Sequence, residues 1–413
     1  MTNFISSALN DNDYAIGVFL DLQKAFDVVS HEILLKKLHN LGIQNVTLSW
    51  FQSYLSGRSQ CVDINGNLST PKNINISVIQ GSVLGPLLFL CFINDLPNAS
   101  KILKLLLFAD DTCALDRDEN LHTLINRCNS ELQNLTNWFI INKISVNAAK
   151  CKYIIFHRPR KKIPTNLPCV FLNFNIKGNL DDPSQITTLE RVGSSNPNPD
   201  NRYLKYLGIL MDEHLSFSYH IEAICKKLNR ALFCLNRVKH VLNIKALTTI
   251  YCSLFHSHLL YCNIILNCAS PPLLKKISTL QKKAIRTITK STYNAHTASL
   301  FLSCKILPFD DILINSRLNF MHSIYFKQSH FSFTNLWKLN EQRETDISLR
   351  NQNNFQLPLP KTDAFKRSPL YLLPKTWNDL DAAAKCHENN FTFSCHIKDT
   401  VFRRLEAEVV FAH

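Results

Sequence analysis

The stretch Lys104-Leu105-Leu106-Leu107-Phe108-Ala109-Asp110-Asp111-Thr112-Cys113-Ala114-Leu115 consists of two apolar runs separated by a pair of acids. Short apolar runs on either side of a polar pair predict a β-hairpin with the acids at its turn. Adjacent carboxylates repel each other, and flanking buried strands raise the cost of their charge, so a bound cation is the expected compensation. Mg²⁺ is the natural candidate because it binds oxygen ligands and keeps coordination positions for water and phosphates.

Two acids in one turn rarely complete such a site, so we expect a further carboxylate at the end of a neighbouring strand. The apolar run Ala15-Ile16-Gly17-Val18-Phe19-Leu20 ends at Asp21 and supplies one. The sequence therefore predicts that Asp21 lies beside Asp110 and Asp111.

Length and composition favour a multidomain protein with real hydrophobic cores, since the chain has 413 residues of which 46% are hydrophobic. The longest apolar run, Val83 to Ile93, is too short to cross a bilayer, so we expect no membrane association. The 14 cysteines are scattered without a CxxC pair, and no amino-terminal signal peptide is visible. This pattern is typical of reduced thiols in an intracellular protein, nuclear or cytoplasmic or both.

The net charge of +14 is unevenly distributed. Residues 1–150 contain 11 Lys and Arg against 13 Asp and Glu, whereas residues 205–290 contain 13 against 3. An acidic site followed by a strongly basic segment suggests that the first part acts on phosphates and the second holds a polyanion.

The pattern along the chain predicts an α+β fold with an antiparallel sheet that carries acids at its turns. The order of expected elements is strand, helices, hairpin, helix and strand, after a polar stretch at 1–14. A segment rich in Pro, Asn, Ser and charge suggests an exposed insertion, followed by a further strand and two long basic helices. The predicted division is 1–158, a polar insertion at 159–202, a basic helical part at 203–290, and an extension of unknown role at 291–413.

Three motifs identify a family resemblance. Gly17-Val18-Phe19-Leu20-Asp21-Leu22-Gln23-Lys24-Ala25-Phe26-Asp27, Gln80-Gly81-Ser82-Val83-Leu84-Gly85-Pro86-Leu87-Leu88-Phe89 and Phe108-Ala109-Asp110-Asp111 resemble successive polymerase motifs of reverse transcriptases from non-LTR retrotransposons, above all jockey-like and CR1-like elements. The resemblance covers about residues 10–290. It implies a palm at 1–158, a primer grip and thumb at 203–290, and RNA-directed DNA synthesis from dNTPs on an RNA template and a DNA primer.

The resemblance also assigns roles to individual residues. It implies that Asp21, Asp110 and Asp111 bind two Mg²⁺ ions, that Lys150 protonates the leaving pyrophosphate, and that Phe26 excludes ribonucleotides. Gln80 and Gly81 match contacts to the template and nucleotide. The turn before them departs from the family, which usually has Gly and Pro where Ser77 and Ile79 stand. The primer and duplex contacts fall on Tyr206, Leu207, Gly208, Lys226, Lys227, Arg230, Lys282, Lys283 and Arg286.

Other interpretations of these residues remain open. Phe26 could be a core side chain, Lys150 a surface lysine, and the basic helices solvated faces. Zinc binding by Cys252, His256, His258, Cys262 and Cys268 is disfavoured because their neighbours are apolar. The fingers and endonuclease regions of relatives are expected to lie outside this sequence, so a truncated, catalytically silent nucleic-acid-binding remnant is the main alternative. A metal-dependent nuclease would leave Phe26 and Gln80 unexplained.

Overall fold

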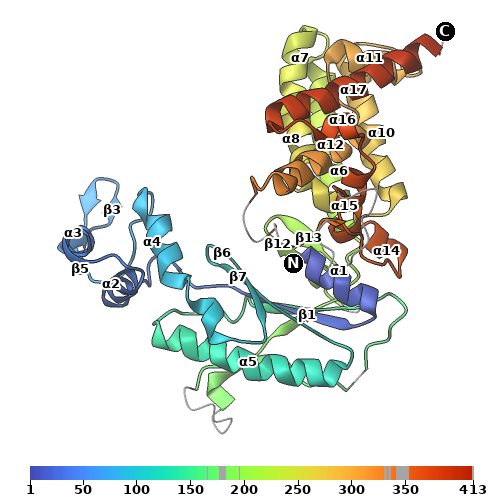
Figure 1. Ribbon diagram of the computed structural model, residues 1–413. Helices are drawn as coiled ribbons and strands as arrows, with labels where there is room; N and C mark the ends of the chain where they lie inside the picture. Colours follow the sequence, from blue (N-terminus) through green and yellow to red (C-terminus); the bar gives the residue numbers. More distant parts are fainter. Residues whose placement is uncertain are drawn as a thin grey trace. The chain divides into compact units, whose positions relative to one another are not determined.

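The computed structural model describes residues 1–164, 166–175, 183–194, 196–329, 333, 336–340 and 353–411. It divides into two compact units (Figure 1). The first contains Met1 and residues 12–202, and the second contains residues 2–11 and 203–413. The division after Arg202 falls where the composition of the sequence changes.

A five-stranded sheet forms the centre of the first unit, with the strand order β11-β8-β1-β7-β6. All neighbours are antiparallel except β11 and β8. The predicted α+β class is confirmed. Every residue of the central strand β1 is buried, which accounts for its continuous apolar sequence. The strands are β1 (Tyr14–Leu20), β6 (Lys104–Phe108), β7 (Asp111–Asp118), β8 (Lys152–Phe156) and β11 (Glu190–Val192).

Helix α5 (Leu121–Ile141) packs against the sheet through an apolar face with the period of a helix. Its N-terminus is capped by the side chain of Asn120, which accepts hydrogen bonds from the amides of His122 and Thr123. Three helices and a 3₁₀ turn lie between β1 and β6 in the sequence: α2 (His31–Asn40), α3 (Asn45–Leu55), α4 (Leu84–Ile93) and η1 (Leu96–Ala99).

Two small hairpins follow α3. Strands β3 (Asp63–Ile64) and β4 (Asn67–Leu68) are joined by Asn65-Gly66, both at positive φ, as this dipeptide predicts. Around them, β2 (Arg58–Gln60) pairs with β5 (Lys72–Ile74).

The segment expected to be an exposed insertion, 159–202, is in part a component of the core. Its strand β11 adds to the main sheet beside β8, and β9 (Phe171–Asn173) pairs with β10 (Ile186–Thr188). Val170, Leu172 and Val192 are almost completely buried. The expectation of an exposed insertion was wrong because short strands inside a polar segment carry too few residues to show a periodicity. The turns η2 (Pro183–Gln185) and η3 (Pro199–Asn201) complete this segment.

The second unit is mainly helical and begins with a hairpin of β12 (Leu204–Tyr206) and β13 (Ile209–Met211). The long basic helices predicted from the sequence are α6 (Ser218–Val238) and α10 (Pro271–Ile288), which pack against each other. Between them lie α7 (Ile244–Tyr251), the π-helical turn η4 (Cys252–His256), α8 (Ser257–Leu260) and α9 (Asn263–Leu266).

Residues beyond 290 share this unit with the basic helices. Their core gathers around Trp377 and Phe393, which are completely buried. The helices are α11 (Thr297–Cys304), α12 (Phe309–Tyr325), α14 (Asp363–Lys366), α15 (Pro369–Asn378), α16 (Ala382–Lys385) and α17 (Asn390–Phe411).

The polar stretch expected at 1–14 contains a helix, α1 (Thr2–Asp11), that packs against α14 and α15. Its Ile5 and Ala8 are completely buried. A ten-residue helix is marginal by itself and depends on such packing, which its own sequence does not reveal. Throughout the described ranges, no helix is long and apolar enough to span a membrane.

Candidate active site

Three carboxylates lie at neighbouring strand ends in the first unit. Leu20, the last residue of β1, pairs with Thr112 of β7, so the same antiparallel register places Asp21 opposite Asp111. Asp110 lies in the two-residue turn between β6 and β7, where Ala109 has a φ of 54°. The structure thus brings together the acids that the sequence predicted to be neighbours.

Asp111 feels the charges of the other two acids. Partial desolvation, and then the negative charges of Asp110 and Asp21, raise the pKa of Asp111 above its usual value. The two neighbouring carboxylates therefore make ionisation of Asp111 more costly. A cation bound among them would remove this repulsion.

Both main-chain polar groups of Asp21 are fixed by the segment that precedes β8. The amide of Asp21 donates to Sγ of Cys151 at 3.3 Å, and its carbonyl accepts from the amide of Asn147 at 2.8 Å. An isolated bridge between Leu22 and Val146 continues the contact. This pairing orients the Asp21 carboxylate through its backbone. The contacts of Cys151 and Asn147 with Asp21 were not predicted from the sequence.

Lys150 belongs to the same segment. Its Nζ lies 3.7 Å from Oδ2 of Asp21, and its side chain is 70% exposed. At this exposure the ion pair adds little stability, and the ammonium group remains free to reach another anion near Asp21.

Phe26 packs on helix α4. Its ring stacks on that of Phe89, with 5.0 Å between centroids and 26° between planes. Phe26 is partly buried, whereas Phe89 is almost completely buried. The carbonyl of Phe26 accepts from the amide of Val78 at 2.8 Å, so the ring is held both by its packing and by its backbone.

The turn before α4 carries Gln80 and Gly81. The side chain of Gln80 donates to Oδ1 of Asp27 at 2.9 Å, which ties two of the sequence motifs together. Gly81 has a φ of 80°, and no atom lies within 4 Å of a Cβ built on it. The backbone at Gly81 is therefore open to a ligand that approaches closely.

A serine hydroxyl and a glycine close this turn onto the helix. Oγ of Ser82 donates to the carbonyl of Ile79 at 2.7 Å and accepts from the amide of Gly85 at 2.9 Å. A Cβ on Gly85 would lie 2.5 Å from the same carbonyl. Position 85 therefore requires glycine.

Ser77 is the strained residue of the segment. Its φ is 97°, a conformation that favours glycine, and it is held there by its neighbours. Its amide donates to the carbonyl of Val29 at 2.8 Å, and its own carbonyl lies 2.7 Å from Nε2 of His31. Ser77 therefore has a backbone conformation that suits glycine, the residue usual at this position in the family that the motifs resemble.

In the second unit, Tyr206, Leu207 and Gly208 form the tight hairpin between β12 and β13. Leu207 and Gly208 are both at positive φ, at 45° and 78°. The hydroxyl of Tyr261 donates to the carbonyl of Leu207 at 2.6 Å, and its ring lies against Gly208. Tyr261 was not predicted from the sequence, because nothing local links it to a turn more than 50 residues earlier.

Helices α6 and α10 run in the same direction. Cys225 lies near Lys276, and further along the hydroxyl of Thr287 donates to Oδ1 of Asn236 at 3.4 Å. In both pairs the residue of α10 follows its partner in α6 by the same number of positions. Such a constant separation means that the two helices run parallel. Arg286, one of the predicted duplex contacts on these two helices, is half-buried. The others on these helices are exposed: Lys226, Lys227, Arg230, Lys282 and Lys283.

These cations do not share one face. Burial, and then the charge of Lys227, lower the pKa of His220 to about 4, so Lys227 lies on the His220 side of α6. Lys282 lines a hollow that also contains Asp310 and Asp311. Lys283 and Arg286 line a different hollow. The periodicity of the helices showed which residues are polar but not which faces would meet.

The five Cys and His residues of 252–268 do not gather their ligand atoms in the described part of the chain.

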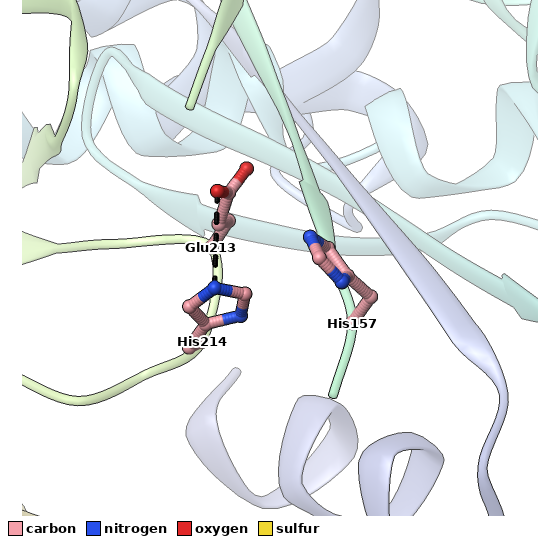
Figure 2. Close-up of side chains that lie close together, drawn as sticks. All are labelled: His157, Glu213 and His214. Atoms are coloured by element: carbon pink, nitrogen blue, oxygen red, sulfur yellow. Dashed lines mark ion pairs between the residues drawn. The ribbon is translucent and has the colours of Figure 1, made fainter. Parts of the chain in front are cut away.

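The sequence did not single out Glu213 and His214, which follow β13. They form an ion pair of 3.9 Å between Oε1 and Nε2, with Glu213 buried (Figure 2). His157, also labelled in that figure, follows β8 in the first unit.

Asp212 fixes the segment that leads into α6. Its carboxylate accepts hydrogen bonds from the amides of His214, Ser216 and Phe217, at 2.9 to 3.1 Å. This loop is therefore a structural cap for the helix.

Comparison with known proteins places these elements in a family. Residues 2–211 match the family described as reverse transcriptase (RNA-dependent DNA polymerase). The chain is 27% identical to the RNA-directed DNA polymerase from mobile element jockey of Drosophila melanogaster, over 78% of this chain and 34% of that protein. It is 31% identical to the probable RNA-directed DNA polymerase from transposon BS of the same species, over 73% of this chain and 32% of that protein.

The chain thus spans about a third of the length of the curated relatives it matches. A solved structure of telomerase from Candida albicans, in complex with a TWJ fragment of telomeric RNA, aligns with 13% identity and a TM-score of 0.30. That alignment covers 81% of this chain and 51% of the telomerase chain. The sequence matches confirm the resemblance to polymerases of jockey-type mobile elements, and the chain belongs to the reverse transcriptase family.

Proposed function

We propose that this chain catalyses RNA-directed DNA synthesis, the transfer of a nucleotide from a dNTP to the 3′-hydroxyl of a DNA primer paired with an RNA template. The observation that carries the proposal is the convergence of Asp21, Asp110 and Asp111 at adjoining strand ends. Family membership supplies the reaction class, and the carboxylate cluster supplies the chemistry that phosphoryl transfer requires.

The acids fit a pair of Mg²⁺ ions. They offer only oxygen donors, and Asp110 and Asp111 are exposed, so coordination positions remain for water and phosphate oxygens. When bound, the two ions would stabilise the charge that develops on the attacking and leaving oxygens. Asp21 and Asp110 are the main ligands in this proposal, with Asp111 beside them.

Neighbouring residues bind and orient the substrates. Lys150, held near Asp21 but largely exposed, donates a proton to the leaving pyrophosphate. Phe26, supported from behind by Phe89, presents its ring to the sugar and excludes a ribose hydroxyl. The open backbone at Gly81, next to Gln80, contacts the template and the incoming nucleotide.

The second unit supplies the duplex contacts in this proposal. The hairpin of Tyr206, Leu207 and Gly208 grips the primer. The exposed cations of α6 and α10 that lie outside the hollow lined by Lys283 and Arg286 hold the phosphate backbone of the duplex: Lys226, Lys227, Arg230 and Lys282. Of the palm predicted at 1–158, Met1 and residues 12–158 lie in the first unit and act as the palm, and 203–290 act as the primer grip and thumb.

Primer extension on an RNA template tests the proposal. Asp21→Asn and Asp110→Asn should each reduce Mg²⁺-dependent synthesis by at least about 100-fold, because a lost carboxylate misplaces the reacting groups. Glu119→Gln, which neutralises an exposed acid at the end of β7 opposite to Asp111, should have no effect. Circular dichroism should show that all variants are folded.

Retained synthesis in either aspartate variant would refute the site. A chain that binds primer–template but never extends it would instead be the catalytically silent, nucleic-acid-binding remnant.

A further inference from the structure

A hollow of about 530 Å³ lies between the C-terminal halves of α6 and α10 and the loop that follows α10. Its volume is in the range of small-molecule and nucleotide sites. The side chains that carry the argument are Lys239 and His240 after α6, Lys283, Arg286 and Lys290 on and after α10, and Tyr293 in the loop.

The charge of this hollow is of one sign. Among the described residues that line it, none is acidic. From Ala223 to Phe309 the sequence has 13 Lys and Arg and no Asp or Glu. The ends of two parallel helices contribute about half a negative charge each, or about one in total. The four Lys and Arg of the lining therefore leave an excess of about three positive charges, which an anion would neutralise.

An aromatic ring stands beside these cations. Tyr293 is 77% exposed, and the guanidinium carbon of Arg286 lies 6.0 Å from its ring centroid. The loop is tied to α10, since Nε of Arg286 donates to the carbonyl of Ala295 at 3.1 Å and the amide of Ser291 donates to the carbonyl of Arg286 at 3.0 Å. Tyr293 therefore presents its ring to solvent from an ordered position.

We propose that this hollow binds a single-stranded nucleic acid, with one base stacked on Tyr293 and the adjoining phosphates held by Lys283, Lys290 and Lys239. A cationic groove with an exposed ring is the usual arrangement for single strands. In a duplex the base faces are covered by their neighbours, so a duplex would leave Tyr293 unused. The inference rests on the proposed function only in that the chain handles nucleic acid, and it needs neither the metal site nor catalysis.

Fluorescence anisotropy with an unstructured twelve-nucleotide RNA, in EDTA and without dNTPs, tests the inference. Tyr293→Ala should weaken binding roughly 5- to 150-fold through lost stacking. Phe233→Ala is the matched control, because Phe233 is also exposed beside an arginine, Arg237, but lies outside the hollow. It should leave the affinity unchanged.

Charge variants test the phosphate contacts. Replacing Lys283 and Lys290 by Gln should lower the slope of log affinity against log salt by about 1.4, or about 0.7 for each single-strand contact. Lys275→Gln, on α10 but outside the hollow, should not change the slope.

An abasic strand of equal length should bind more weakly than RNA and be insensitive to Tyr293→Ala. If Tyr293→Ala had no effect on RNA, or if poly-glutamate bound as well as RNA, the hollow would be a general anion or acidic-protein site and the inference would be overturned. Because the assay contains no metal or dNTP, loss of polymerase activity cannot produce either result.

Discussion

Single residues of the first unit are held by bonds to distant parts of the chain. Asp21 is fixed through its backbone by Asn147 and Cys151, and Ser77 is held at a φ of 97° by Val29 and His31. The cost of such a conformation in a residue other than glycine is about 1–3 kcal/mol. The surrounding bonds must offset it.

Ser77→Gly should therefore stabilise the first unit by about 1 kcal/mol, since relief of the strain exceeds the added flexibility of the unfolded chain. The free energy of unfolding of the first unit, measured by urea unfolding with a signal from its sheet, gives this change. Ser77→Ala is the control: it removes the hydroxyl but keeps the Cβ, so it should give no gain. Equal effects of Gly and Ala would show that the backbone at position 77 is not strained.

Phe26→Val should let ribonucleotides in. The shorter side chain removes the ring that the proposal places against the sugar, while Phe89 remains to fill the space behind it. The preference for dNTP over rNTP, measured as the ratio of kcat/KM values, should fall by about tenfold or more. An unchanged ratio would mean that Phe26 only packs on Phe89.

At the scale of elements, the hairpin of β12 and β13 depends on a residue outside itself. Two consecutive positive φ angles give the turn its shape, and the hydroxyl of Tyr261 holds the carbonyl of Leu207. A two-stranded hairpin is marginal alone, so this contact should keep the turn in one conformation.

Tyr261→Phe should speed amide hydrogen exchange in residues 206–209 by about 2- to 10-fold, because a single hydrogen bond contributes about 0.5–1.5 kcal/mol. The retained ring should preserve the packing on Gly208. Tyr293→Phe removes a hydroxyl from another exposed tyrosine of the unit and should not alter exchange in the hairpin. If exchange there stayed the same in Tyr261→Phe, the turn would be stable by itself.

At the scale of the whole molecule, the second unit is assembled from both ends of the sequence. The side chain of Asn10 donates to the carbonyl of Leu359 at 3.1 Å and accepts from the amide of Lys361 at 2.8 Å. Nζ of Lys361 also lies 3.3 Å from Oδ1 of Asp11. These bonds fasten α1 to the segment before α14, although the partners are about 350 residues apart.

Asn10→Ala should remove two hydrogen bonds to main-chain groups, those of Leu359 and Lys361, and destabilise the second unit by about 1–3 kcal/mol, since each bond contributes about 0.5–1.5 kcal/mol. We expect faster hydrogen exchange at the amide of Lys361 and at α14, while β1 and β7 in the first unit keep their protection. Ser6→Ala, elsewhere on α1, should leave exchange at Lys361 unchanged. Protection of Lys361 that survived in Asn10→Ala would show that α1 does not hold this segment.

The sequence alone determined the features that depend on neighbours along the chain. Apolar runs on either side of a polar pair predicted the hairpin at Asp110, and an Asn-Gly dipeptide is typical of the turn at Asn65-Gly66. Helical periodicity predicted α5, α6 and α10, because local backbone preference and one buried face suffice for a helix. The motifs carrying Asp21, Asp110 and Asp111 predicted the family, and the acids at the strand ends predicted that Asp21 lies beside Asp110 and Asp111.

Only the tertiary structure decided the features whose partners are far apart. These are the place of β11 in the sheet, the docking of α1 against α14 and α15, the bond from Tyr261 to the primer-grip hairpin, and the separation of Lys227, Lys282 and Lys283 onto different sides. Each depends on a contact that leaves no periodic trace in either segment. A sequence pattern shows whether a side chain will be buried or exposed. The residue against which it packs is determined only when the chain has folded.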